Sequence, residues 1–273
     1  MEPQLSGIEF RDLDVREGDS VDLAVRQIKP DVIFHLAGKP GGGRTPEAFV
    51  EQYETTLGGA VNVAVAAMRH KIPHMVHIGS SEEYGDGPTP FQEGQPERPI
   101  SAYSAAKIAA TQFFMAAARS RLLSATVLRL MVVYGPGQEG SMLIPQLFAS
   151  YLWGRPAKLS PGDQSRDFVY IADVIAALLS CGLRPDLSGE VFNVGLGRQH
   201  QVKDAAKMVA DLCDYHEDLG LGQLPYRNPE VMCHCASLDK VQEMLGWQPT
   251  VQLAEGLKLT LAWWVERKGR RDG

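Results

Sequence analysis

Short apolar segments of strand length alternate with segments of helix length in the chain as far as residue 195. The strand candidates are residues 7–10, 31–37, 74–80, 126–133, 168–171 and 190–194. The helix candidates between them are residues 20–28, 46–69, 101–119, 142–153 and 173–183. This alternation is typical of βαβ units, whose strands form a parallel sheet. The runs VIF and TVLRLMVV are almost entirely apolar, as expected of strands that helices cover on both faces.

The pattern changes after residue 195. Three helix candidates follow, at residues 202–215, 238–245 and 253–267, and loops rich in proline and glycine separate them. With 273 residues, of which 44% are hydrophobic, the chain is long enough to bury a large core. We therefore predict an α/β fold with a doubly wound parallel sheet from residues 1–135 and 165–195. Residues 136–164 and 196–273 are predicted to form a smaller, mostly helical lobe that binds substrate.

Charge and hydropathy argue against several classes of protein. The formal net charge is −6, and the one dense basic run lies at residues 267–271, so no nucleic-acid partner is expected. No apolar stretch approaches the ~20 residues of a membrane helix, and MEPQLSGIEF lacks the features of a signal peptide. Four cysteines do not make a disulfide framework in a chain of this length. We expect reduced thiols in a cytoplasmic protein that does not bind membranes.

No metal site is predicted. A Cys-His-Cys triplet occupies residues 233–235, but no second cluster of ligands accompanies it. His70, His74 and His77 are also close in the sequence. Pro73 interrupts them and they lead into an apolar strand, so they are expected to be surface and core residues.

The segment YSAAK, from Tyr103 to Lys107, is the strongest local signal of chemistry. Pro99 and Ser101 precede it, which favours a helix that begins there. On such a helix Tyr103 and Lys107 share one face. A free tyrosine has a pKa of about 10, too high for a base at neutral pH, and a nearby ammonium lowers it. The pair could then transfer a proton to or from a substrate hydroxyl.

A tyrosine and a lysine at this spacing are most often surface residues, but further motifs accompany this pair. HIGSSEEYGDG, residues 77–87, ends an apolar strand, and ligands bind at such strand ends in parallel sheets. The later motifs RLMVVYGPGQ, SRDFVYIADV, FNVG and LGWQP occupy residues 129–138, 165–174, 192–195 and 245–249. In this order the set resembles the extended short-chain dehydrogenase/reductase family, which contains NAD-dependent nucleotide-sugar epimerases and dehydratases. The resemblance runs from about residue 7 to 267 and implies a Rossmann-like fold.

The resemblance implies a catalytic role for four residues. Tyr103 is implied to be the acid/base, with Lys107 as its partner. Ser80 is similar to the serine or threonine that hydrogen-bonds the sugar hydroxyl under oxidation. Glu82, in the run Ser80-Ser81-Glu82, resembles the carboxylate of the GDP-mannose 4,6-dehydratase type, which takes a proton so that water leaves. The alternative for Glu82 is a solvated loop residue.

The resemblance also implies the binding residues. NAD or NADP is expected to contact Asp14, Val15, Leu36, Ala37, Gly38, Lys39, Thr56, Tyr103 and Lys107. The nucleotide-sugar substrate is expected to contact Ser81, Arg166 and Arg227, with the two arginines at its phosphates.

The segment GKPGGG, residues 38–43, resembles a phosphate-binding loop but lacks its spacing. A dinucleotide fingerprint opens a helix with its glycines and has an acidic residue about 20 residues later. Here Arg44, Thr45 and Pro46 follow, so a substrate-side loop is predicted. In the family that this chain resembles, the cofactor loop belongs to a first βαβ unit, and residue 1 falls near the expected third strand. The resemblance thus implies a fold incomplete at the N-terminus: a truncated sequence, a natural short form, or strands supplied by a partner.

The specific reaction is left open by the sequence. Thr56 and Val132 stand where the family usually has asparagine. We predict an NAD(P)-dependent epimerase or dehydratase that acts at C4 of a nucleoside-diphosphate hexose. One alternative is a reductase of nucleoside-diphosphate 4-keto-6-deoxysugars. The other is a non-catalytic protein that has lost cofactor binding and either binds nucleotide sugars or acts as a regulatory subunit. The nucleotide, the sugar and the choice between NAD and NADP are not determined.

A homodimer is also expected. The resemblance implies contact between copies through the helices at residues 46–69 and 101–119. Small residues on the second helix permit close packing: Ala109, Ala110, Ala116 and Ala117.

Overall fold

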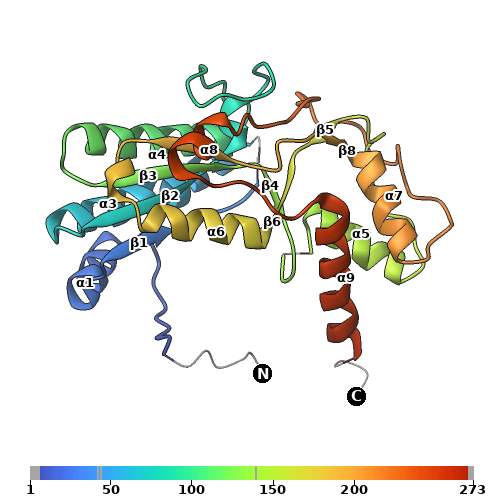
Figure 1. The fold of residues 1–273 in the computed structure, drawn as a ribbon, viewed down its shortest axis with the longest axis horizontal. Coiled ribbons are helices and arrows are strands. Elements are labelled where there is room, and N and C mark those ends of the chain that lie inside the picture. Colours follow the sequence, from blue (N-terminus) through green and yellow to red (C-terminus); the bar gives the residue numbers. More distant parts are fainter. Residues whose placement is uncertain (1–6, 42, 44, 139, 270–273) are drawn as a thin grey trace.

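The computed structural model describes residues 7–41, 43, 45–138 and 140–269. Its centre is a parallel sheet with the strand order β1-β2-β3-β7 (Figure 1). These strands are β1 (Val32–His35), β2 (His74–Ser80), β3 (Ala125–Leu130) and β7 (Val191–Val194). The register pairs Met75 with both Ile33 and Ala125. The predicted α/β class and the parallel sheet are confirmed.

Helices cover both faces of this sheet. On one face α1 (Gly18–Ile28), α3 (Gly59–Arg69) and α4 (Ala102–Arg119) pack against Met75 and Val127. On the other face α6 (Ile171–Gly182) and α8 (Asp239–Leu245) pack against Val76 and Leu128. Successive strand residues point to opposite faces, so the continuous apolar runs supply both halves of the core. The sheet is therefore doubly wound.

A second group of elements lies beside the sheet, on the right of Figure 1. It contains the parallel pair β4 (Val132–Tyr134) and β6 (Phe168–Tyr170), and the antiparallel pair β5 (Ser165–Arg166) and β8 (His200–Gln201). The helices here are α5 (Leu143–Leu152), α7 (Val202–Leu212) and α9 (Leu253–Gly269). Their apolar side chains share one buried cluster, with members such as Phe148, Phe168, Val209 and Leu257. The domain boundaries proposed from the sequence stay a prediction.

Two strand predictions are wrong in detail. Residues 126–133 form two strands, because the chain changes partners at Met131. Met131 N donates to the Val194 carbonyl (2.8 Å), whereas Val132 N donates to the Asp167 carbonyl (2.9 Å). Residues 7–10 form no strand, because no described strand lies beside them to accept their backbone hydrogen bonds. Figure 1 shows this segment running away from the sheet.

The helix predicted over residues 46–69 contains a π-helical turn. It begins as α2 (Pro46–Gln52), where the Thr45 hydroxyl accepts a hydrogen bond from Ala48 N (3.3 Å). Residues Tyr53–Gly58 then form the π turn, and α3 follows without a break. Such turns are rare and occur frequently at functional sites. This one contains Thr56, which the sequence assigned to cofactor binding.

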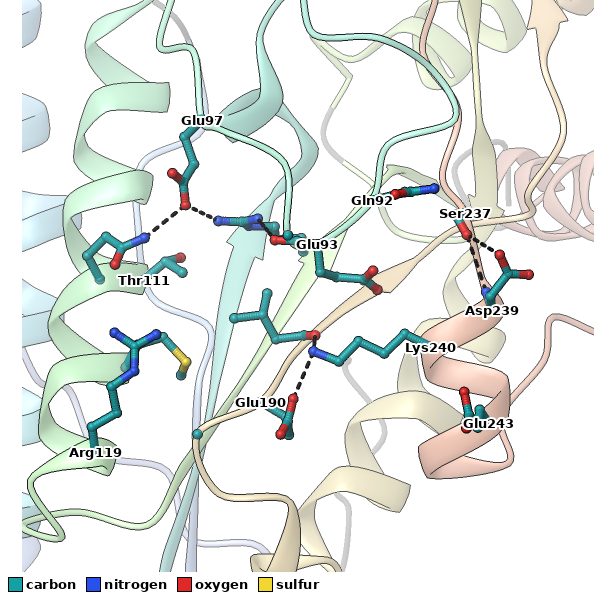
Figure 2. A pocket seen from close by; sticks show the side chains of 16 residues that line it. Gln92, Glu93, Glu97, Thr111, Arg119, Glu190, Ser237, Asp239, Lys240 and Glu243 are labelled. Carbon is teal, nitrogen blue, oxygen red and sulfur yellow. Dashed lines mark hydrogen bonds and ion pairs between the residues drawn. The ribbon is translucent and has the colours of Figure 1, made fainter.

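The two edges of the central sheet differ. At the β7 edge, Lys240 Nζ donates to the Val191 carbonyl (2.9 Å) and pairs with Glu190 (2.8 Å), while Asn193 N donates to Glu93 (2.8 Å). A cleft of about 570 Å³ lies between these side chains and α4 (Figure 2). At the β1 edge, Val32–His35 pairs with β2 on one side, and no described strand pairs with its other side.

Among the described residues, no helix is long and apolar enough to cross a membrane. The same residues contain no group of three His, Cys, Asp or Glu side chains arranged to hold a metal ion.

Candidate active site

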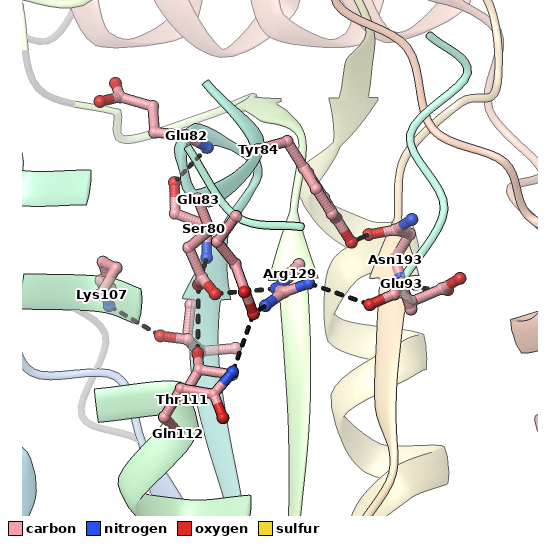
Figure 3. Close-up of polar contacts among 12 residues, drawn as sticks. Ser80, Glu82, Glu83, Tyr84, Glu93, Lys107, Thr111, Gln112, Arg129 and Asn193 are labelled. Carbon is pink, nitrogen blue, oxygen red and sulfur yellow. Dashed lines mark hydrogen bonds and ion pairs between the residues drawn. The ribbon is translucent and has the colours of Figure 1, made fainter. Parts of the chain in front are cut away.

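Ser80 is the last residue of β2, at the carboxyl end of the sheet. A short 3₁₀ turn, Ser81–Tyr84, follows it. The Ser80 hydroxyl accepts a hydrogen bond from Glu82 N (3.2 Å), and Ser80 N donates to Glu83 Oε1 (2.7 Å; Figure 3). These two contacts form a capping box, which fixes the backbone where the strand becomes a turn. The structure thus presents Ser80 at the strand end that the sequence indicated.

The start of α4 is fixed by a second capping box. The Ser101 hydroxyl accepts a hydrogen bond from Ser104 N (3.1 Å), and the Ser104 hydroxyl accepts one from Ser101 N (2.9 Å). The helix begins at Ala102, so Tyr103 lies in its first turn and Lys107 lies one turn later. The predicted helix start and the shared face are confirmed.

Lys107 is buried at the carboxyl end of β2. Its Nζ donates to the Ile78 carbonyl (2.7 Å) and lies 5.8 Å from the centre of the Tyr103 ring. Burial lowers the pKa of Lys107 to about 8, and the negative charge of Glu83 acts in the opposite direction. A buried ammonium is costly unless it is partnered, and the strand carbonyl is the partner here.

The pKa of Tyr103 shifts in the direction opposite to the predicted one. The spacing of Tyr103 and Lys107 predicts that the ammonium lowers this pKa. Burial instead raises the pKa of Tyr103 to about 12, although a side-chain hydrogen bond with Ser80 acts in the opposite direction. Lys107 directs its ammonium at the Ile78 carbonyl, and burial is the largest influence on the pKa of the Tyr103 phenol. Tyr103 nevertheless lies close enough to Ser80 for the two side chains to interact.

The segment after β1 brings further predicted residues to Lys107. A Cβ atom added to Gly38 would lie 3.8 Å from Lys107 Nζ and 3.7 Å from Thr56 Oγ1. Lys39 N donates to Thr56 Oγ1 (3.4 Å). Gln52, which the sequence reasoning missed, accepts a hydrogen bond from the Thr56 hydroxyl (2.6 Å) and donates to the Lys39 carbonyl (3.0 Å). The π turn and the segment at residues 36–39 therefore form one wall beside Lys107.

Asp14 and Val15 lie in the segment that precedes α1. The exposed carboxylate of Asp14 pairs with Arg16 (2.6 Å), whose hydrogen bonds lower the pKa of Asp14 to about 2. Asn62 Nδ2, on α3, donates to the Val15 carbonyl (2.9 Å) and holds the segment against the helix. Among the described contacts, none joins Asp14 or Val15 to Tyr103 or Lys107. Gly42 and Arg44 of the glycine-rich loop lie outside the described residues.

The two adjacent glutamates have different environments. Glu82 is partly exposed, and its Oε2 accepts a hydrogen bond from the Ser101 hydroxyl (3.3 Å). Glu83 is completely buried, and its Oε2 accepts from Arg129 Nε (2.8 Å). Figure 3 shows the Glu82 carboxylate directed away from Arg129 and the Glu83 carboxylate directed toward it. Ser81, between Ser80 and Glu82, is buried.

The Glu83–Arg129 pair was missed by the sequence reasoning. Arg129 lies in β3, within the apolar run TVLRLMVV. A single arginine in a strand that is covered on both faces must have a buried acidic partner, and this signal could have revealed the pair. The Tyr84 ring also packs on the guanidinium, with Arg129 Cζ 4.7 Å from the ring centre.

The two predicted substrate arginines both lie next to Glu230. Arg166, in β5, donates to the carbonyls of Ser165 (2.7 Å) and Val231 (2.8 Å) and pairs with Glu230. Arg227 N donates to the same Glu230 carboxylate (3.2 Å), and its side chain is exposed. Glu230 thus joins the two positions, although no described contact links them to Tyr103.

The fold and the grouping of Ser80, Tyr103 and Lys107 define a Rossmann-like α/β protein with a polar site at the carboxyl ends of its parallel strands. Residues 2–195 match the family model described as the NAD dependent epimerase/dehydratase family. The chain therefore belongs to the NAD-dependent epimerase/dehydratase family, and the predicted family is confirmed.

Curated relatives and solved structures include both reaction types. The chain is 29% identical to a UDP-glucose 4-epimerase from Mycolicibacterium smegmatis, with coverage of 93% of this chain and 82% of the relative. It is 27% identical to a dTDP-glucose 4,6-dehydratase from Neisseria gonorrhoeae, with coverage of 96% and 82%. The solved structure of MoeE5 in complex with UDP-glucose and NAD superposes with a TM-score of 0.88 at 27% identity, over 94% of this chain and 86% of that one.

Proposed function

We propose that this chain catalyses NAD(P)-dependent hydride transfer at C4 of a nucleoside-diphosphate hexose, as an epimerase or a dehydratase. The observation that carries the proposal is the grouping of Tyr103 and Lys107 at the end of β2, where Ser80 lies: Lys107 Nζ is 5.8 Å from the centre of the Tyr103 ring and donates to the Ile78 carbonyl. Relatives of both types, and a solved relative that holds UDP-glucose and NAD, support this class of substrate and cofactor.

In this mechanism Tyr103 takes the proton from the C4 hydroxyl and Ser80 donates a hydrogen bond to the developing ketone oxygen. When bound, NAD(P)⁺ supplies the acceptor for the hydride that leaves C4. The wall of Gly38 and Thr56 beside Lys107 suits the ribose end of such a cofactor, because it brings exposed backbone and a hydroxyl next to the ammonium. The remaining proposed cofactor contacts are Asp14, Val15, Leu36, Ala37 and Lys39.

The fate of the 4-keto sugar depends on Glu82. In a dehydratase, Glu82 removes the C5 proton, and the C6 hydroxyl leaves as water when it gains a proton. Glu82 suits this role better than Glu83, because Glu82 is partly exposed and faces Ser101, whereas Glu83 is buried against Arg129. In an epimerase, the ketone is reduced again on its other face and Glu82 contributes no proton transfer.

A second candidate is a reductase of nucleoside-diphosphate 4-keto-6-deoxysugars. The observation that favours it is the pKa of Tyr103, which burial raises to about 12. A phenol that keeps its proton is suited to donate that proton to a ketone oxygen as hydride arrives at C4. In this direction Tyr103 acts as the acid rather than as the base.

The substrate phosphates are proposed to bind at Arg166 and Arg227, with Ser81 contacting the sugar. Arg166 presents its guanidinium beside Glu230, so a bound diphosphate competes with that carboxylate for it. The exposed side chain of Arg227, whose backbone contacts Glu230, adds a second positive charge.

A homodimer through residues 46–69 and 101–119 is proposed as the assembly. Phe49, Val50 and Tyr53 are exposed on the first of these helices, which supports contact with an apolar surface. Ala110 and Ala117 do not contribute as the sequence suggested, because both pack into the core of their own chain. Light scattering at several concentrations tests the dimer, and Val50→Asp should shift it to monomer.

The function is tested by turnover. The purified chain is incubated with UDP-glucose, dTDP-glucose or GDP-mannose and with NAD⁺ or NADP⁺, and products are separated by mass and by chromatography. The reductase is tested with the corresponding 4-keto-6-deoxysugar and NADH or NADPH. Turnover that disappears in Tyr103→Phe supports the proposal. The absence of both turnover and nicotinamide binding by calorimetry would overturn it.

A further inference from the structure

The buried pair formed by Glu83 and Arg129 lies directly beneath the proposed catalytic residues. Both side chains are at most 1% exposed. The other end of Arg129 pairs with Glu97 (2.8 Å), and its Nη1 donates to the Glu93 carbonyl (3.4 Å). The guanidinium is thus held from several sides. The mechanism proposed above makes no use of this pair.

The Glu83 carboxylate joins three elements of the site. Its Oε1 accepts hydrogen bonds from Ser80 N (2.7 Å), at the end of β2, and from the Thr111 hydroxyl (3.2 Å), on α4. Its Oε2 accepts from Arg129, on β3. Thr111 follows Lys107 by four residues and Tyr103 by eight, so it lies on the same face of α4. Figure 3 shows the carboxylate between the strand end and the helix.

We propose that Glu83, held by Arg129, is a positioning residue that fixes the Ser80 backbone relative to the helix that carries Tyr103 and Lys107. This inference rests on the proposed function, because it assigns the pair a role in hydride transfer. The physical reason is that a single buried carboxylate, anchored to β3, receives one donor from each of the two elements that must meet at the substrate oxygen. A shift of about 1 Å in such a geometry lowers a rate by roughly 100-fold.

Gly79 leaves room for the Glu83 carboxylate, because it has no side chain. A Cβ atom at Gly79 would lie 2.6 Å from Glu83 Oε1 and 3.2 Å from Arg129 Cγ. A side chain at residue 79 would therefore displace the carboxylate from its position beneath Ser80. The glycine in HIGSSEEYG is explained by this close approach, and Gly79→Ala is expected to have the same consequence as the loss of Glu83.

The pair could instead serve folding alone, and the variants are chosen to separate the two roles. Glu83→Gln keeps the size and removes the charge. The double variant Glu83→Met with Arg129→Met removes both charges of the pair together, while the partly exposed Glu97 keeps its hydrogen bond from Gln112 (2.8 Å). Thr111→Val removes one donor at nearly constant shape, and Thr111→Ser restores it. Asp173→Asn is the control, because Asp173 is also buried and accepts hydrogen bonds from Thr250 and Val251, in contact with neither Ser80 nor α4.

Two measurements are made on variants that circular dichroism shows to be folded. The first is the amide resonance of Ser80 in serine-labelled protein, assigned with Ser80→Ala. An amide that donates to a carboxylate resonates at low field, so Glu83→Gln and the double variant should move this resonance while Asp173→Asn leaves it in place. The second is turnover: kcat should fall by about 10- to 100-fold while KM changes by less than about threefold. Thr111→Val should show a smaller fall, which Thr111→Ser reverses.

The outcomes are distinguishable. A Ser80 resonance that does not move in Glu83→Gln overturns the proposal, and so does a fall in kcat no larger than that of Asp173→Asn. If the wild-type chain neither turns over a nucleotide sugar nor binds a nicotinamide cofactor, the proposed function fails. The amide resonance still decides whether Glu83 holds Ser80, because that measurement needs neither cofactor nor substrate.

Discussion

The end of β2 and the end of β1 lie side by side in the sheet, yet they differ in burial and in the contacts that hold them. At the end of β2, Ser80 is 8% exposed and Lys107, which donates to this strand, is 4% exposed. At the end of β1, Phe34 is 37% exposed and Leu36 is 60% exposed. The first strand end is fixed by a capping box, a buried ion pair and the N-terminal turns of α4. The second is held chiefly through Lys39, Thr56 and Gln52.

The difference shows which of the proposed catalytic groups the fold positions without a ligand. The groups proposed to move protons are placed before any ligand binds, since their partners are backbone and buried side chains of the same chain. The β1 side presents apolar surface that other edges of a sheet avoid: the β7 edge carries Lys240 and Glu93 on its backbone groups. We expect substitutions near the end of β2 to lower the rate of catalysis strongly. We expect substitutions at the end of β1 to change the free energy of unfolding little.

The largest effect, on kcat, is expected from a substitution at Tyr103. Replacing it with phenylalanine removes the proposed acid/base and should lower kcat by about 10²- to 10⁴-fold, the usual contribution of such a group. Single-turnover formation of the reduced nicotinamide measures the step. Tyr151→Phe is a matched control, because Tyr151 is a buried tyrosine of the lobe that donates to the Leu219 carbonyl (3.0 Å). Equal losses in the two variants would contradict the proposed role.

A stability effect is expected from Lys107. Burial lowers the pKa of Lys107 from 10.5 to about 8, so the folded chain loses this proton before the unfolded chain does. Between about pH 8 and pH 10.5 the unfolded state binds more protons, and the stability of the wild type should rise relative to Lys107→Met. The gain is on the order of 3 kcal/mol at most. Urea unfolding across this range measures it, and a constant difference between the proteins would show that Lys107 is solvated.

An intermediate effect, on substrate binding, is expected at Arg166. Arg166→Met should raise the dissociation constant for UDP by about tenfold, because a charge-assisted hydrogen bond to phosphate is lost. Glu230→Gln should lower that constant, since it removes the carboxylate that competes for Arg166. Calorimetric titration of UDP measures both. Changes of the same sign in the two variants would indicate that the pair only supports the fold.

The smallest effect is expected at Leu36. Leu36→Ser should change the free energy of unfolding by less than about 0.5 kcal/mol, as for other exposed positions. Leu128→Ala, in the core of the same sheet, should cost about 2–5 kcal/mol. Urea unfolding gives both values. A large loss in Leu36→Ser would mean that the end of β1 is covered in solution, and the contrast between the two strand ends would no longer hold.

Local features were readable from the sequence because they depend on neighbouring residues. Alternating apolar strands and helix-length segments indicated a doubly wound parallel sheet, and all strands of the central sheet were located to within a few residues. Pro99 and Ser101 indicated the start of α4, and the capping box at Ser101 placed Tyr103 and Lys107 on one face. The end of β2 was correctly expected to present Ser80.

Tertiary structure alone decided which partners these residues meet. Glu82 and Glu83 are adjacent and identical in type, and only the position of Arg129 on β3 makes one a buried anchor and leaves the other near Ser101. The pKa of Tyr103 rises because burial depends on the whole fold, whereas the spacing to Lys107 indicated the opposite direction. β3 ends at Leu130 because Val132, two residues later, donates its hydrogen bond to Asp167 instead. Spacing and capping are local properties of the chain, while burial, ion pairing and strand pairing depend on residues far apart in sequence.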